Sequence, residues 1–397
     1  MPLPWPNAYK DLKNRLYSEW AIQGDIEILR EFGDGKSDAR VFEVDLISKN
    51  HSGQAILKLD VLSSGSSDGR NEADRLRQAQ DTSPDFAHNH LPRFLDFFQD
   101  GNQMALLSSI AGDRLSYVQP FYRVDIYQQC VAMQRIASGV LNEWNRDYSI
   151  SIALPPITYL ADWLKDRLDP LGGRIQEFLW EECKLDPTER SFSVAGKWLP
   201  NPYAYAKTPT LWPSNHEVKF IKGRSHGDLH GFNLLIKIDG TYSYPYYLID
   251  LAFYSEDTFL FFDQAYLELG YLLHYMGNVP TNRWLTVLDA LGTATSGIHL
   301  GIEPEDASFL TVITVGREEI SKWTAKKEPH RQDHMEGQAL LASVAAGLNF
   351  VNKKTLDDRQ KKLALLYAAV NLEKYFNLFD IGWSRQGPAL GVRQIYR

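Results

Sequence analysis

Apolar and polar residues change their spacing once along the chain, from strand-like runs to a helical repeat. A short helical pattern at 11–20 is followed over 26–61 by apolar and β-branched runs that are separated by a glycine-bearing turn and by SKNHSG. Such runs and breaks are typical of successive antiparallel strands. One helix is predicted over 71–80, and two more strands at 93–101 and 102–110. These residues predict a small antiparallel β-sheet with one helix.

Beyond residue 112 the apolar residues recur mainly at helical spacing. The predicted helices cover 124–145, 157–167, 173–184, 262–276, 282–294, 306–326, 334–350 and 357–378. Two strand-like runs, NLLIKID and YYLIDLAF, interrupt them, and a segment rich in proline and tryptophan at 185–222 predicts an ordered irregular loop. We therefore expect an α+β chain with a β-rich N-terminal lobe at 1–112 and a larger, mainly helical lobe at 113–397.

Composition narrows the class of protein. The 397 residues are 44% hydrophobic and 12% aromatic, enough for two cores. The net charge is −8 without long blocks of either sign, so no general affinity for nucleic acid is predicted. The two cysteines lack the spacing of a disulfide or zinc framework, and no run approaches the roughly 20 apolar residues of a membrane span. We expect a cytoplasmic protein that does not associate with membranes.

One short run, SHGDLHGFNLLI at 225–236, contains several polar side chains of the kinds that catalytic sites use. It places Asn233 five residues after Asp228 on a glycine-bearing loop, and an apolar strand begins directly after the asparagine. The Asp228 carboxylate can accept or orient the proton of a substrate hydroxyl, and the side-chain oxygen of Asn233 can ligate Mg²⁺ that is bound to nucleotide phosphates. The spacing therefore favours phosphoryl transfer.

A second acidic residue completes this set. The run YYLIDLAF puts Asp250 at the end of an apolar strand, and the hairpin-like sequence KIDGTYSYPY joins it to the strand after Asn233. Two strands that flank a turn would bring Asn233 and Asp250 together, and hard oxygen donors of this kind suit Mg²⁺. The sequence therefore predicts a metal site at Asn233 and Asp250.

The order of these residues resembles the catalytic and metal-binding segments of the protein-kinase-like superfamily. Gly227, where protein kinases carry arginine, makes it similar to the aminoglycoside phosphotransferase branch. The resemblance implies ATP and Mg²⁺ as cofactors, Lys58 of AILKL as the phosphate-binding lysine, and Glu72 as its ion-pair partner. Taken alone, a lysine in a strand is also typical of a solvated edge, and a glutamate at a helix start of dipole stabilisation.

The same resemblance implies a phosphate-covering turn in FGDGKSDARVFEV. Gly33, Gly35 and Ser37 would bind the nucleotide there together with Lys58, because glycine lets backbone amides approach phosphates. The sequence departs from the family at Asp38, which replaces the third glycine. Asp34 adds a further negative charge that Mg²⁺, Lys36 or solvent would have to offset. A lone Gly-x-Gly is also an ordinary hairpin turn.

A wider resemblance covers most of the chain. The segments ILKLD, SHGDLHGFNLLI, LIDLAFY, FDQAYLELGYLL and ASVAAGLNFVNK are together similar to the ternary-complex-associated kinase-like domains of prokaryotic signalling and conflict systems. That family implies a two-lobed kinase-like fold, often joined to effector modules, so effector-domain or protein partners are expected. It leaves the substrate unassigned.

Within the second lobe, an insert at 124–222 and a catalytic segment at 225–250 are expected. No Ala-Pro-Glu segment follows Asp250, and the chain is predicted to pass straight into a helix, so the segment that docks peptide substrates in protein kinases is missing. By analogy with the resembled antibiotic and choline kinases, acidic and aromatic residues of the insert would accept a small cationic molecule.

Several side chains near the motif have more than one interpretation. His226 and His230 could form a metal pair, but their spacing on a glycine-rich loop favours His226 as a hydrogen-bonding residue that holds the loop. His230 could help to neutralise the transferring phosphoryl group or act as a spacer. Asp263 could cap a helix or tie the catalytic loop. Tyr266 is interpreted as a core residue.

The sequence is compatible with three functions. The preferred one is an ATP-dependent phosphotransferase with Asp228 as base, Lys58 and Glu72 at the phosphates, and Asn233 and Asp250 on Mg²⁺, acting on an unknown acceptor, small rather than peptidic. The alternatives are a nucleotide-binding sensor without turnover in a signalling or defence module, and a scaffold that binds no nucleotide. Hydrolase and P-loop patterns are not evident.

Overall fold

A computed structural model of the chain describes residues 2–33, 39–61, 70–112, 114–169, 171, 173–208, 217–238, 240, 244–293, 302–383, 385 and 387–390. They form two compact units. The first unit comprises Met1–Arg123 and Phe232–Tyr254, and the second comprises Val124–Gly231 and Ser255–Arg397. Gly35 and Ser37, with the neighbouring Asp34, Lys36 and Asp38, lie outside the described residues.

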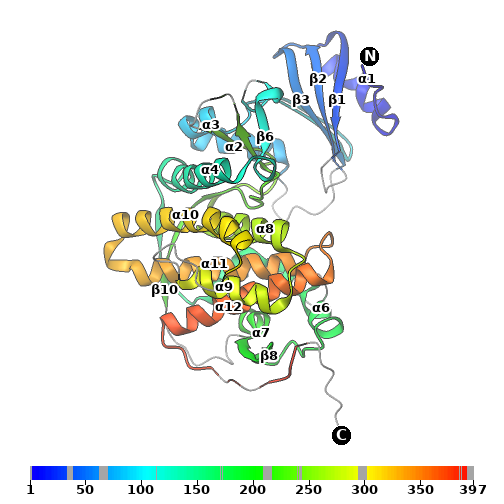
Figure 1. Cartoon of the computed structure of the whole chain (residues 1–397). Coiled ribbons are helices and arrows are strands. Elements are labelled where there is room, and N and C mark those ends of the chain that lie inside the picture. Colours follow the sequence, from blue (N-terminus) through cyan, green and yellow to red (C-terminus); the bar gives the residue numbers. More distant parts are fainter. Residues whose placement is uncertain are drawn as a thin grey trace. The chain divides into compact units, whose positions relative to one another are not determined.

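The first unit is built on a five-stranded antiparallel sheet with strand order β1-β2-β3-β5-β4. Figure 1 shows β1, β2 and β3 side by side. Its strands are β1 (Gln23–Phe32), β2 (Arg40–Ile47), β3 (Ser52–Val61), β4 (Phe94–Asp100) and β5 (Gln103–Ser108). Burial alternates along β2 and β3, so every second side chain enters the core. On β3 the residues Ala55, Leu57 and Leu59 are buried, which fixes the register of the strand and turns Lys58 to the opposite face.

Helices complete this unit. They are η1 (Asn7–Tyr9), α1 (Lys10–Glu19), α2 (Glu72–Thr82), α3 (Pro84–His90), η2 (Leu115–Tyr117) and η3 (Phe121–Arg123). Leu12 and Leu16 of α1 share one apolar cluster with Phe42 and Leu57 of the sheet, so the amphipathic helix packs where its pattern predicts. The start of α2 is fixed by a capping box in which the side chains of Asn71 and Asp74 each accept a backbone hydrogen bond. This cap determines where Glu72 begins the helix.

A small second sheet explains why a later part of the chain belongs to the first unit. Strand β11 (Leu234–Lys237) pairs antiparallel with β12 (Tyr246–Leu248) on one side and with β6 (Val118–Pro120) on the other. The compact units therefore divide the chain differently from the predicted lobes at 1–112 and 113–397, because these non-local strand pairs draw 113–123 and 232–254 into the first unit.

The second unit is mainly helical. Its helices are α4 (Ile126–Gly139) with the π-helical turn η4 (Val140–Trp144), α5 (Ile157–Leu164), η5 (Lys165–Leu168), α6 (Ile175–Glu181), α7 (Pro202–Lys207), α8 (Phe262–Met276), α9 (Thr281–Thr293), α10 (Pro304–Lys327), η7 (Pro329–Arg331), α11 (Gln332–Val351) and α12 (Asp358–Leu378). Helices α11 and α12 pack closely at Gly347, where a Cβ atom would lie 2.7 Å from the Ala368 Cβ and from the Ala364 carbonyl oxygen. Glycine is required there because the two backbones approach so closely.

Two short sheets accompany these helices. One has the order β13-β10-β7, from β7 (Ser149–Leu154), β10 (Val218–Ser225) and β13 (Ser255–Phe259), and the other pairs β8 (Ser191–Val194) with β9 (Lys197–Pro200). Strand β10 leads directly into the sequence HGD. The short sheet therefore positions the start of the predicted catalytic loop.

The predicted fold class is confirmed: the chain is α+β, with an antiparallel N-terminal sheet and a helical remainder, as in a kinase-like bilobal fold. The expectation of one irregular segment at 185–222 was wrong, because this segment contains β8, β9, α7 and the start of β10. The expected direct passage from Asp250 into a helix was also wrong, because β13 intervenes. In the described part of the chain, no helix is both long and apolar enough to cross a membrane.

Candidate active site

Lys58 lies between two carboxylates inside the first unit. Its Nζ is 2.6 Å from Oε2 of Glu72 on α2 and 3.0 Å from Oδ1 of Asp250, which follows β12. The Lys58 and Glu72 side chains are only 14% and 10% exposed, whereas that of Asp250 is 38% exposed. The three charges therefore meet at the border of the core, with Asp250 facing solvent.

Lys58, Glu72 and Asp250 together comprise one basic and two acidic side chains. Burial alone would lower the pKa of Lys58, but the neighbouring charges of Glu72 and Asp250 outweigh it and raise the pKa above its ordinary value. Burial raises the pKa of Glu72 to about 6; Lys58 opposes this shift and Asp250 adds to it. One cation is thus shared by two carboxylates, and the group retains an excess of negative charge.

Asn233 and Asp250 are brought together by the pairing of β11 with β12. The backbone N–H of Ile249 donates to the carbonyl oxygen of Asn233 at 3.0 Å, so Asp250 follows the residue that pairs with Asn233. Asp250 has a φ of +62°, in the left-handed region that aspartate tolerates better than most residues. The Asn233 side chain is buried. The hairpin therefore produces the juxtaposition that the sequence predicted.

The donor types fit Mg²⁺. A carboxylate and an amide oxygen are hard ligands, and Mg²⁺ is commonly bound through one or two protein groups, with water and phosphate oxygens in the other positions. Among the described residues no group of three or more His, Cys, Asp or Glu side chains could hold a metal ion, so a metal cage made of protein ligands alone is not found there. Asn233 and Asp250 would hold Mg²⁺ together with a nucleotide.

Of the three residues predicted to bind the nucleotide in the phosphate-covering turn, only Gly33 is described. Gly33 follows β1, is exposed, and has open space where a Cβ atom would lie. Its conformation does not itself require glycine. The roles assigned to Gly33, Gly35 and Ser37 stay predictions.

The predicted catalytic loop, in the second unit, is held by Asp263 in the first turn of α8. The Asp263 carboxylate accepts the backbone N–H of His226 at 2.7 Å and that of Gly227 at 2.9 Å. His226 is fully buried, and its Nδ1 lies 3.3 Å from the backbone nitrogen of Asp228. Of the alternatives left open by the sequence, these contacts support loop fixation by both Asp263 and His226.

The Asp228 carboxylate has three polar neighbours in the second unit. The Tyr266 hydroxyl on α8 donates to Oδ1 at 2.5 Å, Nζ of Lys353 lies 3.5 Å from the same oxygen, and Nε2 of His230 lies 3.7 Å from Oδ2. The Lys353 ammonium also lies over the rings of Tyr266 and Phe350, 4.8 and 4.9 Å from their centroids. The interpretation of Tyr266 as a core residue alone was incomplete, because its buried ring carries a hydroxyl that contacts Asp228.

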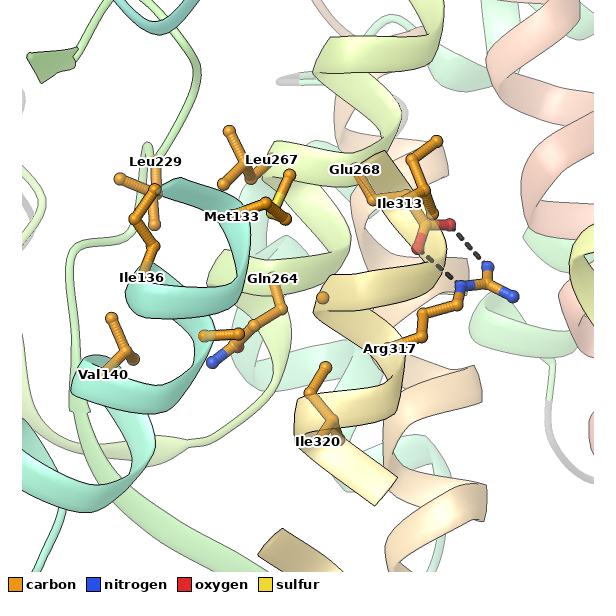
Figure 2. A pocket seen from close by; sticks show the side chains of 12 residues that line it. Met133, Ile136, Val140, Leu229, Gln264, Leu267, Glu268, Ile313, Arg317 and Ile320 are labelled. Carbon is orange, nitrogen blue, oxygen red and sulfur yellow. Dashed lines mark hydrogen bonds and ion pairs between the residues drawn. The ribbon is translucent and has the colours of Figure 1, made fainter. Parts of the chain in front are cut away.

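Leu229, the residue after Asp228, forms part of the wall of a small cavity between α4, α8 and α10 (Figure 2). About 30 Å³ of this cavity is open to a water-sized sphere. Its walls are mostly apolar, and the Glu268–Arg317 ion pair lies at one side. The loop thus has a polar side at Asp228 and an apolar anchor at Leu229.

The predicted site residues are therefore distributed over two sets. Lys58, Glu72, Asn233 and Asp250 lie in the first unit, and Asp228 lies in the second. Tyr266 and Lys353 were not predicted as neighbours of Asp228. The only signal for Lys353 was its place in ASVAAGLNFVNK, which carried the family resemblance but assigned the lysine no role.

Lys58 on the third strand of the sheet pairs with Glu72 at the start of the following helix, a type of pair that protein kinases also contain. No protein-family model and no curated protein matches the sequence. Solved structures do match, among them ethanolamine kinase from Plasmodium vivax, with 12% sequence identity and a TM-score of 0.40 over 93% of this chain and 84% of that one. Similarity at this level does not assign the chain to a family.

Proposed function

We propose that the chain is an ATP-dependent phosphotransferase that uses Mg²⁺ and acts on a small hydroxyl compound in the cytoplasm. The observation that carries the proposal is the contact of Lys58 with both Glu72 and Asp250. In kinase-like enzymes the corresponding lysine and glutamate must pair for the lysine to hold the α- and β-phosphates, and the aspartate binds Mg²⁺. A structural ion pair would not require a third, solvent-facing carboxylate on the same lysine.

Each residue has a distinct role in this proposal. Lys58 binds the phosphates, Glu72 orients Lys58, and Asn233 and Asp250 hold the metal. Mg²⁺, when bound, neutralises phosphate charge. Asp228 receives the proton of the acceptor hydroxyl as the acceptor oxygen attacks the γ-phosphorus and ADP leaves. Asp263 keeps the loop in place through the backbone of His226 and Gly227.

A small acceptor is favoured over a peptide. After Asp250 the chain enters β13 at Ser255 and α8 at Phe262, which leaves little room for a long peptide-docking segment. We also propose effector domains or other proteins as partners, on the basis of the family resemblance alone.

Thermal unfolding with ATP and Mg²⁺, separately and together, tests the nucleotide site. We expect a rise in melting temperature that requires both ligands, because a ligand that binds only the folded state stabilises it. Asp250→Ala should abolish the metal-dependent part. Asp81→Ala, which removes an exposed carboxylate of α2 in the same unit, should retain it. No rise at saturating ATP with Mg²⁺ would refute the nucleotide site and favour a scaffold.

A nucleotide sensor without turnover is the second candidate, and one observation favours it. Oδ1 of Asp228 already accepts the Tyr266 hydroxyl and lies 3.5 Å from Nζ of Lys353, so a substrate hydroxyl must compete with protein groups for this oxygen or use Oδ2. Phosphorylated product distinguishes the candidates. For a phosphotransferase, product forms with the wild type and falls at least about 100-fold in Asp228→Asn, because a positioned general base contributes that much. Nucleotide-dependent stabilisation without product from any hydroxyl compound would favour the sensor.

A further inference from the structure

Lys353 is held next to Asp228 by an arrangement that fixes its ammonium group. It stands two residues beyond the end of α11, where its backbone N–H donates to the Phe350 carbonyl at 3.1 Å. Its Nζ lies over two aromatic rings and 3.5 Å from Asp228, and the Tyr266 and Phe350 rings are themselves 4.6 Å apart. Cation–π attraction and the carboxylate both favour this one position.

The same ammonium remains accessible to a ligand. The Lys353 side chain is 29% exposed and that of Asp228 is 25% exposed, so both reach the surface of the second unit. A hydroxyl that donates to Oδ1 of Asp228 would place its oxygen within about 6 Å of Nζ of Lys353, from a hydrogen bond of roughly 2.7 Å added to the 3.5 Å contact of the same Oδ1. At that range a charged substituent near the hydroxyl interacts directly with Lys353.

We infer that Lys353 selects the acceptor, and that the acceptor is a hydroxyl compound with an anionic group, a carboxylate or a phosphate, a few bonds from the hydroxyl. The inference rests on the proposed phosphotransferase activity and reverses the sign of the acceptor charge expected from the sequence. A cationic amino alcohol would place its ammonium against Lys353, whereas an anionic acceptor would pair with it.

The reaction balances with the groups named. The acceptor oxygen bonds to the γ-phosphorus of ATP, the bond from that phosphorus to the β–γ bridging oxygen breaks, and ADP carries away the electron pair. The hydroxyl proton passes to the Asp228 carboxylate. Lys353 takes no proton and forms no covalent bond. It is a specificity-determining residue that pairs with the anionic group of the acceptor.

The test compares acceptors of equal length and opposite charge. ADP release is measured with 3-hydroxypropanoate against 3-aminopropan-1-ol, and with glycerate against 3-aminopropane-1,2-diol. We expect kcat/KM to favour the anionic member by about tenfold or more. In Lys353→Met this preference should disappear through a higher KM for the anion, and Lys353→Arg should restore it. Lys354→Met, which alters the exposed neighbouring lysine, should behave as wild type.

The outcomes separate this inference from the proposed function. Preference for the cationic members, or an anionic preference unchanged in folded Lys353→Met, overturns the inference. An equal fall of kcat for every acceptor in Lys353→Met also overturns it, because that result marks a role in the transfer step itself. No turnover with either anion, in a chain that Mg²⁺ and ATP still stabilise, overturns it while the nucleotide site stands. Loss of both stabilisation and turnover means that the proposed function has failed.

Discussion

At the scale of single residues, the main feature of the site in the first unit is that one lysine interacts with two carboxylates. Lys58 is shared between Glu72 and Asp250. A buried carboxylate that shares its cationic partner with a second carboxylate is costly to ionise. This is why burial outweighs Lys58 in setting the pKa of Glu72. In the proposed function, Mg²⁺ bound to Asp250 would offset this cost and would leave Lys58 to Glu72 and the phosphates.

The raised pKa of Glu72 makes stability depend on pH. Between its ordinary value of 4.5 and about 6, Glu72 holds a proton in the folded chain but has lost it in the unfolded chain. Folding therefore takes up a proton in this window. The contribution of Glu72 to the free energy of unfolding is fully present below pH 4.5 and falls by about 2 kcal/mol as the pH rises through 6.

Urea unfolding of wild type and Glu72→Gln at several pH values measures this. The difference in unfolding free energy, wild type minus variant, should fall from pH 4.5 to 6 and then level off. A difference that stays constant, or rises, over this window would show that Lys58 fully compensates the buried charge.

The residues of the first set could be predicted because their order along the chain is informative. Asn233 and Asp250 were predicted from the hairpin between them, whereas Lys58 and Glu72 were implied by the family resemblance through their order relative to Asp228. The neighbours of Asp228 are different. Tyr266 and Lys353 reach it across 38 and 125 residues of sequence. Only the packing of α8 and α11 brings them together, and no local pattern encodes that.

At the scale of elements, α8 holds the conformation of the loop that carries Asp228. Strand β10 ends at Ser225, and the next two backbone N–H groups both donate to Asp263. Burial raises the pKa of Asp263, while His226 and the donated hydrogen bonds oppose the shift. The long helices were predictable because an apolar stripe of several turns is a strong signal, whereas β7, β8, β9 and β13 span six residues or fewer.

Asp263→Asn tests this connection between the helix and the loop. Asparagine offers one oxygen and one amino group, so one of the two backbone donors would face another donor while buried. We expect a loss of about 2 kcal/mol in the free energy of unfolding, measured by urea denaturation, together with a lower rate of phosphoryl transfer. Asp257→Asn, at a well-exposed carboxylate of β13, is the control and should change neither. Unchanged stability in Asp263→Asn would assign the loop conformation to other contacts.

At the scale of the whole molecule, one buried ion pair connects helices that are far apart in the sequence of the second unit. Arg317 of α10 makes two hydrogen bonds to Glu268 of α8, at 2.5 and 2.7 Å, and a third to the Leu291 carbonyl of α9 at 2.6 Å. Tyr367 of α12 donates to Glu268 at 2.7 Å. Four helices therefore depend on one charge pair, which also borders the cavity behind Leu229 (Figure 2).

This arrangement predicts strong coupling between the two charges. Arg317→Met removes the arginine partner of the Glu268 carboxylate, which is only 10% exposed. Removing one partner of a buried ion pair leaves the other charge uncompensated, so we expect a loss of about 3 kcal/mol in the free energy of unfolding. The 30% exposure of the Arg317 side chain puts the loss at the low end of that class. In Arg317→Met/Glu268→Gln neither charge of the pair is left without its partner, so the double variant should be more stable than Arg317→Met. Urea unfolding of the four proteins in this cycle measures the coupling directly. Additive losses would mean that the pair fixes helix positions through packing alone, and the four-helix connection would then not be electrostatic.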